Sequence, residues 1–240
     1  MTSSLSISRP ALRTIHGQVV QSLGLAIVTG DAAAGDTLAA EPVLCEQLGV
    51  SRGALREAVK ALAAKGMLET RPRTGTRILP RSRWNLLDPD VLDWLGRADR
   101  PGLVAHLTEL RALVEPGAAA LAADRATTAE RRELLATCDA MAAAVEAGDA
   151  AGVTEHDVRF HAVLLRITHN PMLASLNTSL EVAMRASFEM TSGAEGAIEA
   201  SVPLHRALAE AVSSGHAVAA RAASEALIAA SSEHFAAVIR

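Results

Sequence analysis

Two arginines in the segment "GVSRGALREAVKAL", residues 49–62, are spaced so that both could reach DNA bases. Arg52 and Arg56 lie four residues apart in a stretch whose apolar residues recur at helical spacing. Side chains four apart in a helix share one face, so the two arginines would lie opposite Leu55 and Val59. The forked guanidinium of arginine matches O6 and N7 of guanine in the major groove. A solvated basic face is the alternative, and the spacing alone does not decide between the two.

A second group of residues has the chemistry of a metal site. Asp157 and His161 are again four residues apart, and His205 follows near the expected start of a later helix. One carboxylate and two imidazoles suit a first-row divalent ion such as zinc and leave coordination positions open. From the residues alone the simpler interpretation is favoured, in which Asp157 and His161 are ordinary polar side chains on a helix surface.

Charge is distributed unevenly along the chain. The formal net charge is −4, which by itself disfavours nucleic-acid binding. Residues 1–83, however, carry 11 Lys and Arg against 6 Asp and Glu, whereas residues 84–240 carry 12 against 21. Such asymmetry predicts a polyanion-binding module joined to an acidic one.

The composition predicts a mainly α protein with one large or two modest domains. Aromatic residues are only 2% of the 240 residues, tyrosine is absent and alanine is abundant, which favours helices over strands. Cys45 and Cys138 have no metal or redox spacing and fit two inert thiols in a reducing compartment. No apolar run reaches the length of a membrane span and no signal-peptide core is present, so we expect a cytoplasmic protein without a membrane segment.

Residues 1–80 are expected to form a winged helix-turn-helix. A first helix precedes the loop "TGDAAAGDTL", and "EPVLCEQLG" predicts a short second helix that stops at Gly49. Ser51 is expected to cap the helix that carries the two arginines. The segment "MLETRPRTGTRIL" then predicts two short strands around a turn that contains Pro72 and Gly75.

Residues 81–100 are expected to be a linker with a short helix, and residues 101–240 an all-helical bundle. Pro116 should kink the first helix of the bundle. Helical patterns run over 101–123, 128–147, 149–168, 170–190, 197–214 and 217–239. The predicted fold class is therefore mainly α, with an N-terminal winged helix-turn-helix and a C-terminal all-α helical bundle.

The segment "AAEPVLCEQLGVSRGALREAVKALAAKGMLETRPRTGTRI" resembles the DNA-binding domain of GntR-family bacterial transcription regulators along almost its whole length. The resemblance implies that the helix after Ser51 enters the major groove of double-stranded operator DNA. Pro42 departs from the family, in which an arginine often stands at this position, so operator preference is expected to differ. The expected DNA-binding residues are Ser51, Arg52, Gly53, Arg56, Arg71, Arg73 and Gly75.

The rest of the chain resembles the helical effector domain, or FCD domain, of the FadR subgroup of this family. The similar segments are "ELRALVEPGAAALAADRAT", "EHDVRFHAVLLRITHNPML" and "PLHRALAEAV", and the linker looks most like that of galactonate-type, sugar-acid-sensing members. The resemblance places Asp157, His161 and His205 on the family's metal motifs and implies zinc, with nickel or manganese as alternatives. The usual fourth ligand is a histidine, for which this chain has Leu227.

Arg111, Arg185 and Ser201 fall on positions that the resemblance assigns to the effector pocket. A guanidinium beside a metal is a good carboxylate receptor because its paired donors match two oxygens. For Arg111, a salt bridge to Glu115 or Asp157 is the structural alternative. The alignment is loose around Ser192, where galactonate-type relatives offer an aromatic side chain, so the effector need not be galactonate itself.

Together these features predict a homodimeric, ligand-responsive transcription factor. The expected function is repression of a sugar-acid catabolic operon, with release from a palindromic operator when the hydroxy-acid binds. A regulator of the same family that senses another carboxylate is the alternative. Two remoter alternatives are a metal-dependent enzyme, for which no motif supplies a general base, and a DNA-architectural protein whose acidic domain binds no small molecule.

Overall fold

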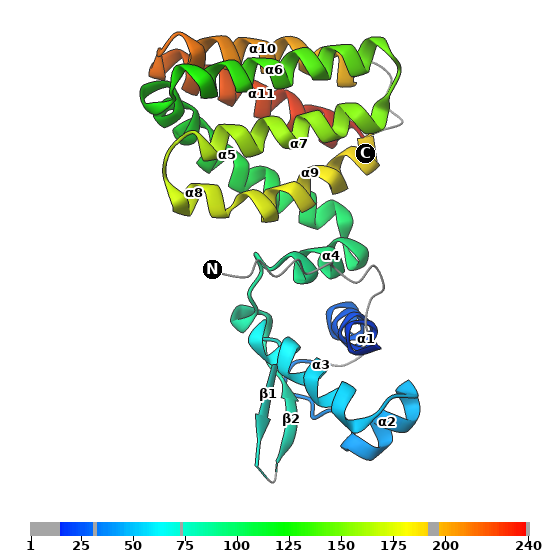
Figure 1. Ribbon diagram of the computed structural model, residues 1–240. Helices are drawn as coiled ribbons and strands as arrows, with labels where there is room; N and C mark the ends of the chain where they lie inside the picture. Colours follow the sequence, from blue (N-terminus) through cyan, green and yellow to red (C-terminus); the bar gives the residue numbers. More distant parts are fainter. Residues whose placement is uncertain (1–14, 31–32, 73, 192–196, 239–240) are drawn as a thin grey trace, which may run out of the picture. The chain divides into compact units, whose positions relative to one another are not determined.

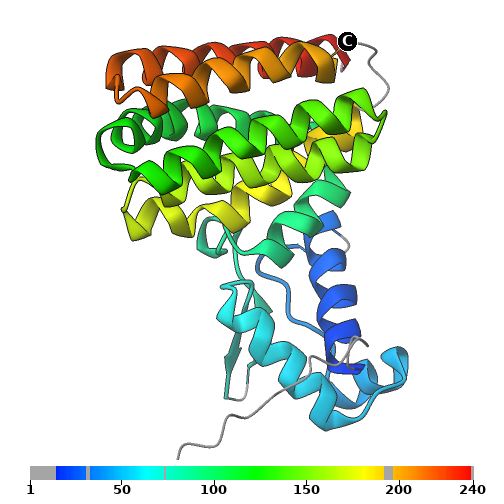
Figure 2. The ribbon, with the colours of Figure 1, turned by 45° about the horizontal axis from the view of Figure 1, so that its top comes forward.

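The computed structural model describes residues 15–30, 33–72, 74–191 and 197–238 (Figures 1 and 2). The chain divides into two compact units, Met1–Ala98 and Asp99–Arg240. The first contains helices and a two-stranded sheet, and the second is helical throughout its described part. The predicted fold class is therefore confirmed. Within the described residues, no helix is both long and apolar enough to cross a membrane.

The first unit contains a helix-turn-helix followed by a β-hairpin. Its second helix stops at Gly49, which has a φ of 64° in the left-handed region that glycine adopts without steric cost. After a short turn, the Ser51 side chain accepts a hydrogen bond from the Ala54 backbone at 3.3 Å and caps the next helix as predicted. The elements are α1 Ile15–Thr29, α2 Glu41–Leu48, α3 Arg52–Ala64, β1 Leu68–Arg71, β2 Gly75–Ile78, the 3₁₀ helix η1 Arg81–Arg83 and α4 Pro89–Ala98.

The hairpin is antiparallel and pairs Leu68 with Ile78 and Arg71 with Gly75. Leu68 and Ile78 are buried against the unit's core, whereas the tip is exposed. Thr37, in the loop before α2, forms a further bridge to Arg77. The hairpin is thus the wing that the sequence predicts, and its base is anchored by Leu68 and Ile78.

The end of α3 is attached to the chain that follows the wing. Gly66 has a φ of 75°, and a Cβ at this position would lie 2.2 Å from the carbonyl oxygen of Arg83, so only glycine fits. The neighbouring Lys65 ammonium lies 2.6 Å from an Asp88 oxygen and 2.8 Å from an Asp90 oxygen. These contacts hold the start of α4 against the end of α3.

Helix α4 is the short helix expected within residues 81–100, and it packs on α1 as part of the first unit. Trp94 is fully buried, and its indole N–H donates to the Gln21 side chain at 2.9 Å. Gly24 of α1 lies directly against the indole ring. The boundary between the two units therefore falls after α4, at residues 98 and 99.

The second unit is a bundle in which α5 packs against α11, and α6 packs against α7 and α10. Its core is rich in small residues, with Ala119, Ala122 and Ala123 of α5 buried among larger side chains such as Leu164 and Leu208. Burial raises the pKa of the Cys138 thiol to about 11, which makes it the inert core residue that was expected. The helices are α5 Arg100–Arg125, α6 Thr128–Glu146, α7 Ala150–Arg166, α8 Pro171–Ser175, α9 Asn177–Thr191, α10 Ala197–Ser213 and α11 Ala217–Val238.

Two details of the bundle differ from the sequence prediction or refine it. The single helix expected over 170–190 is two helices, because the chain breaks at Leu176 and thereby lets Leu173 and Leu180 pack on the same small apolar cluster. Helix α5 continues through Pro116, the proposed kink position. Proline cannot donate to the carbonyl of Ala112, and that residue is exposed, so water can satisfy it.

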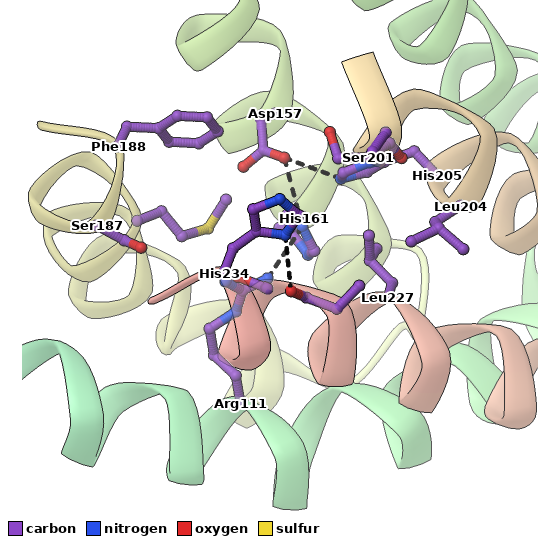
Figure 3. Close-up of a pocket in the computed structure, with 14 residues that line it drawn as sticks. Arg111, Asp157, His161, Ser187, Phe188, Ser201, Leu204, His205, Leu227 and His234 are labelled. Carbon is purple, nitrogen blue, oxygen red and sulfur yellow. Dashed lines mark hydrogen bonds and ion pairs between the residues drawn. The ribbon is translucent and has the colours of Figure 1, made fainter. Parts of the chain in front are cut away.

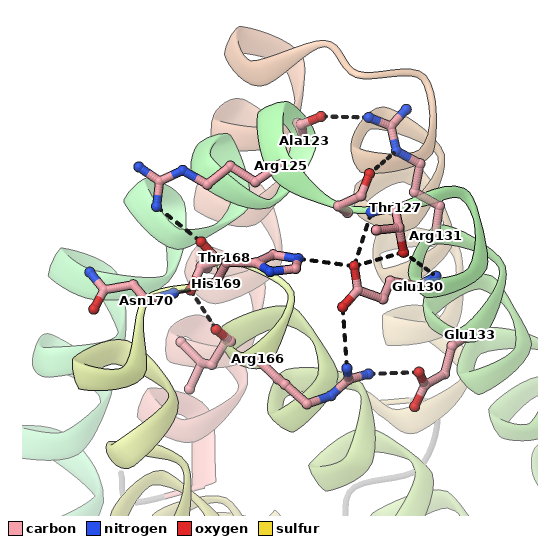
Figure 4. Close-up of polar contacts among 12 residues, drawn as sticks. Ala123, Arg125, Thr127, Glu130, Arg131, Glu133, Arg166, Thr168, His169 and Asn170 are labelled. Atoms are coloured by element: carbon pink, nitrogen blue, oxygen red, sulfur yellow. Dashed lines mark hydrogen bonds and ion pairs between the residues drawn. The ribbon is translucent and has the colours of Figure 1, made fainter.

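Polar contacts hold one end of the bundle together (Figure 4). Thr127 and Glu130 form a capping box at the start of α6. The Glu130 carboxylate also lies 3.0 Å from the His169 ring in the turn that follows α7. Arg131 donates to the carbonyl oxygens of Ala123 at 2.9 Å and Ser213 at 2.7 Å, at the ends of α5 and α10. These contacts fix the relative positions of the helices that carry the site described below.

Substituting Gly24 by alanine should destabilise the first unit. The new Cβ would lie 2.5 Å from ring carbons of the buried Trp94, and overpacking of this kind costs about 1–3 kcal/mol. The higher helix propensity of alanine recovers about 1 kcal/mol of that cost at most. Urea unfolding followed by tryptophan fluorescence would measure the change.

Gly53→Ala is the matched control, because Gly53 is also a helical glycine of the first unit and a Cβ there meets only the Ser51 hydroxyl at 3.9 Å. This variant should be as stable as the wild type or more stable. If Gly24→Ala is the more stable of the two variants, the packing of α1 on α4 described here is wrong.

Candidate functional site

A cavity of about 120 Å³ lies inside the second unit (Figure 3). Side chains from five helices line it: α5, α7, α9, α10 and α11. One water molecule needs roughly 10–15 Å³ of volume measured in this way. The cavity therefore has room for a small molecule but not for a long acyl chain. The polar end of the cavity contains Arg111, Asp157, His161, Ser201 and His205.

The structure brings Asp157, His161 and His205 together, although His205 lies on a different helix. Each residue is buried and offers one ligand atom, and the three atoms lie within 4.8 Å of one another. Asp157 Oδ1 is 2.8 Å from His205 Nε2 and 4.0 Å from His161 Nε2. This is the arrangement expected of ligands that converge on one ion, and the geometry removes the interpretation in which Asp157 and His161 are surface polar residues.

Both imidazoles are oriented by a contact to their other nitrogen. His205 Nδ1 lies 2.9 Å from the carbonyl oxygen of Ser201, and His161 Nδ1 lies 2.8 Å from Glu115 Oε2. The second contact is an ion-pair contact between two buried side chains. If each Nδ1 carries the proton, each Nε2 presents its lone pair toward Asp157.

The donor set fits a divalent metal ion. Among the described residues, His205 Nε2 is buried and has only Asp157 Oδ1 beside it, at 2.8 Å and without a well-directed hydrogen bond. A buried polar atom without a partner costs free energy, and an ion held between this nitrogen and the carboxylate would remove that cost. Leu227 also lines the cavity and is 4% exposed, so the position of the usual fourth ligand offers no donor here.

Arg111 and Glu115 add two buried charges next to the histidines. Arg111 Nε donates to Glu115 Oε1 at 2.6 Å, and Arg111 Nη2 lies 3.1 Å from His161 Nε2. The salt bridge to Glu115, considered as the structural alternative for Arg111, is therefore present, and Arg111 lines the cavity as well. Glu115 was not expected as a site residue, although its position four residues after Arg111 in a helix could have suggested it.

The charged residues stabilise one another's ionised forms. Burial by itself raises the pKa of Glu115, but Arg111 and His161 outweigh it and hold the pKa well below its usual range. Burial likewise opposes ionisation of Asp157, yet the neighbouring His205, His161 and Arg111 lower its pKa. Arg111 in turn has a raised pKa because Glu115 and Asp157 offset its burial. The polar end of the cavity therefore holds buried charged groups that depend on one another for their ionised forms.

The opposite walls of the cavity are largely apolar. Met184 and Phe188 come from α9, and Leu204 comes from α10. His234 lies on α11 and was among the histidines for which the sequence suggested no role. Its Nδ1 contacts the carbonyl oxygen of Ala230 at 3.2 Å. Its spacing of two helical turns from Leu227 could have indicated that it faces the same cavity.

Arg185 is not among the residues that line the cavity. Its guanidinium pairs with Glu181 at 3.0 Å and with Glu155 at 2.7 Å, and 40% of the side chain is exposed. Ser201, by contrast, lines the cavity and orients His205 through its backbone carbonyl. We therefore keep Arg111 and Ser201 in the site and leave Arg185 out.

Three of the arginines expected to contact DNA have exposed side chains, as a DNA-binding surface requires. The side chains of Arg52 and Arg56 on α3 are 70% and 66% exposed, and that of Arg71 on the wing is 62% exposed. Gly75 has a φ of 84° at the start of β2. Ser51 and Gly53 lie at the first turn of α3, and Arg73 lies outside the described residues.

Two family models match the chain. The model of the bacterial regulatory proteins of the gntR family matches residues 15–78, and the FCD domain model matches residues 106–230. These ranges fall in the first and second unit, respectively.

Curated proteins with similar sequences include named regulators. The chain is 36% identical over 197 residues to the galactonate operon transcriptional repressor of Escherichia coli (strain K12), covering 81% of this chain and 85% of that protein. It is 34% identical over 219 residues to the uncharacterized HTH-type transcriptional regulator YieP of the same organism, covering 91% and 94%. It is 31% identical over 171 residues to the Glc operon transcriptional activator of that strain, covering 70% and 66%.

Solved structures are similar to this chain over most of its length. A GntR protein of Streptococcus agalactiae matches with a TM-score of 0.51 and 28% identity, over 90% of this chain and 97% of that one. A structure titled for Lar of Listeria monocytogenes matches with a TM-score of 0.66 over 95% and 99% of the two chains. At 20% identity, this second similarity concerns the fold alone.

Replacing Glu115 by glutamine should strongly destabilise the second unit. The change leaves the buried guanidinium of Arg111 without its anionic partner, and breaking a buried ion pair in this way costs about 3–5 kcal/mol. Chemical unfolding followed by circular dichroism, with a chelator present so that bound metal does not contribute, would measure it.

Glu181→Gln is the control for this substitution. It removes the same charge from a partly exposed pair with Arg185, where the expected cost is about 1 kcal/mol or less. Equal stability of Glu115→Gln and the wild type would show that the buried Arg111 does not depend on its ion pair with Glu115.

Proposed function

The chain belongs to the GntR family of bacterial regulatory proteins and carries an FCD domain, and on this basis we propose that it is a repressor released from operator DNA by a small hydroxy-acid. Its family and its named relatives are transcription regulators, so the protein is a DNA-binding transcription regulator and not an enzyme. The observation that carries the proposal is the buried cluster of Arg111, Asp157, His161 and His205, which lines a cavity in the domain joined to the DNA-binding unit. We expect the protein to act in the cytoplasm, where its DNA target lies.

The ion that we propose for the cluster is zinc, with nickel or manganese as alternatives. Asp157 Oδ1, His161 Nε2 and His205 Nε2 would hold it, and Leu227 leaves the usual fourth position without a donor. When bound, the ion supplies a positive charge and open coordination positions for an anionic oxygen ligand. The contacts at Nδ1 of both histidines support the proposal, since they leave Nε2 available.

Arg111 connects the metal site to the effector. His161 Nε2 has one lone pair, so it cannot both accept from Arg111 Nη2 and ligate an ion. A bound ion would therefore deprive Arg111 Nη2 of His161 as its hydrogen-bond acceptor. Because the Arg111 guanidinium is buried, the loss of this acceptor costs free energy. An effector carboxylate would restore the hydrogen bond, and this makes a carboxylate the functional group that the site favours.

A sugar acid is the first effector to test. The E. coli relative at 36% identity is named for the galactonate operon, and a cavity of about 120 Å³ suits a ligand of this size. A different small carboxylate is the second candidate. It is favoured by the apolar walls that Met184, Phe188, Leu204 and Leu227 provide, since these side chains offer nothing to the hydroxyl groups of a polyol.

The proposed DNA target is a palindromic duplex bound by a homodimer. Arg52 and Arg56 lie on the exposed face of α3, whose first turn is capped by Ser51. In this fold the corresponding helix enters the major groove, and a dimer reads two half-sites. Arg71, Gly75 and Arg73 of the wing would contact the backbone or the minor groove.

We predict that the purified protein holds about one divalent ion per chain and that His161→Ala loses it. Removing one of three protein ligands leaves too few donors to retain the ion. Leu227→His should bind zinc more tightly than the wild type, because the side chain at this position lines the same cavity. Elemental analysis and zinc titration against a competing chelator are the measurements.

His169→Ala serves as the control, since His169 is an exposed imidazole paired with Glu130 at the far end of α7. It should keep the wild-type metal content. A wild-type protein that holds no metal and does not respond to added zinc would contradict the metal proposal.

The effector proposal predicts that Arg111→Lys separates ligand sensing from DNA binding. Lysine keeps the charge beside Glu115 but lacks the paired donors, and loss of a charge-assisted hydrogen bond costs about 1.5–3 kcal/mol. Operator affinity should stay within twofold of the wild type, while the concentration of D-galactonate needed for release rises at least tenfold. Fluorescence anisotropy with a labelled operator duplex measures both quantities.

Other aldonic and uronic acids should be screened by thermal shift before this titration, because a ligand of the folded state raises its stability. Arg185→Lys is the control and should respond like the wild type, since Arg185 pairs on the surface with Glu155 and Glu181. If Arg111→Lys keeps the full ligand response, Arg111 is not the carboxylate receptor.

A further inference from the structure

Glu41, at the start of α2, faces both arginines of α3. Its Oε2 accepts a hydrogen bond from Arg56 Nε at 2.8 Å, and its Oε1 lies 3.9 Å from Arg52 Nε. The Glu41 side chain is 32% exposed, about half the exposed fraction of either arginine. A partly buried carboxylate of one helix thus holds the guanidinium that the next helix presents to solvent.

The contact leaves the reading edge of Arg56 free. A guanidinium has five N–H donors in a planar fork, and the bond to Glu41 uses the one on Nε. The two terminal nitrogens keep the pair of parallel N–H groups that matches O6 and N7 of guanine. A bond at Nε also restricts rotation of the long side chain, so the plane of the fork is set before any base is met.

We propose that Glu41 is a positioning residue for base recognition, which holds Arg56 so that its terminal nitrogens meet a guanine in the major groove. The inference rests on the proposed role of Arg56 in operator binding and adds the residue that makes this arginine selective. It also gives a function to an acidic side chain on a surface that binds a polyanion, where a carboxylate is otherwise unfavourable.

The energetics of the pair change when DNA excludes water. An exposed ion pair contributes little in water because solvent screens it and both side chains lose freedom. In the groove the local dielectric falls and the attraction between Glu41 and Arg56 strengthens. The restricted arginine also loses less rotamer freedom when it binds a base, which lowers the cost of recognition.

The same carboxylate repels the DNA backbone whatever the sequence. Glu41 is held in its charged form, since the hydrogen bond from Arg56 lowers its pKa, and its place in the first turn of α2 favours a negative charge. Glu41 therefore weakens binding to all DNA while it improves discrimination at one base pair. These opposite effects distinguish positioning from a purely structural role, which would lower both together.

The test is selection of binding sites from a pool of randomised duplex DNA, followed by sequencing of the bound fraction. The wild type is compared with Arg56→Ala, Glu41→Gln and Glu41→Asp. The base position at which Arg56→Ala loses its preference is the position that Arg56 reads. At that position, Glu41→Gln and Glu41→Asp should each lose at least fivefold in preference for guanine, with the other positions unchanged.

Affinity for non-specific duplex separates the charge of Glu41 from its contact. Glu41→Gln should bind such DNA more tightly than the wild type, whereas Glu41→Asp keeps the charge and should not. Glu57→Gln is the control, because Glu57 is an acidic residue next to Arg56 on α3 that pairs with Lys60 at 2.8 Å. This variant should keep the wild-type base preference at every position. Circular dichroism confirms that each variant is folded.

Each outcome decides a separate point. If Arg56→Ala keeps the wild-type pattern, Arg56 does not read a base, and both the proposed role of Arg56 and this inference fail. If Arg56→Ala loses one position and both Glu41 variants keep it within twofold, the role of Arg56 stands and the inference is overturned. Loss at a different position in the Glu41 variants would also overturn it, because Glu41 would then read a base itself.

Discussion

The second unit depends on a group of buried charged side chains, Arg111, Glu115 and Asp157, in which each charge is stabilised by its neighbours. Glu115 pairs with Arg111 and contacts His161, while Asp157 contacts His205. Charges removed from water are costly unless each is paired, so the three helices that carry these residues, α5, α7 and α10, must hold their side chains in register for the domain to be stable. The polar end of the cavity is therefore part of the structural core as well as a binding site. A ligand or ion that enters it competes with contacts on which the packing of the bundle relies, and this gives binding a means to change that packing.

The two units use arginine in opposite electrostatic settings. Arg111 is 7% exposed and has defined partners, so it acts as a fixed donor whose surplus hydrogen bonds favour a carboxylate. Arg52 and Arg56 are mostly exposed, so in water they gain little from any single contact. In the DNA complex that we propose, charge and exclusion of water would strengthen their contacts. Each unit also supplies a glutamate that orients its arginine: Glu115 in the bundle and Glu41 in the helix-turn-helix.

The cavity combines a charged end with apolar walls, and this combination bears on selectivity. Leu227 stands where a fourth metal ligand is usual, and Met184, Phe188 and Leu204 extend the apolar surface. Burying polar hydroxyl groups against such walls without hydrogen bonds is unfavourable. Ser187, Ser201, Ser231 and His234 also line the cavity and carry polar atoms, so the number of hydroxyl groups that these four residues can bind limits how polar a ligand the cavity accepts.

Local features of the sequence determined the elements, and tertiary packing determined which side chains meet. Gly49, Ser51 and helical periodicity were enough to predict the helix-turn-helix, because caps and periodicity act within a few residues. The helix break at Leu176 and the attachment of α4 to the first unit were not predictable, because they depend on packing with Leu180 and Gln21 from other elements. Residue types suggested Asp157, His161 and His205, but their burial and convergence depend on how α7 and α10 pack. The contact of Glu41 with Arg56, the contact of Glu115 with His161 and the place of His234 in the cavity wall were decided only by the folded chain. A carboxylate or imidazole has no particular function until the fold places a partner or a cavity beside it.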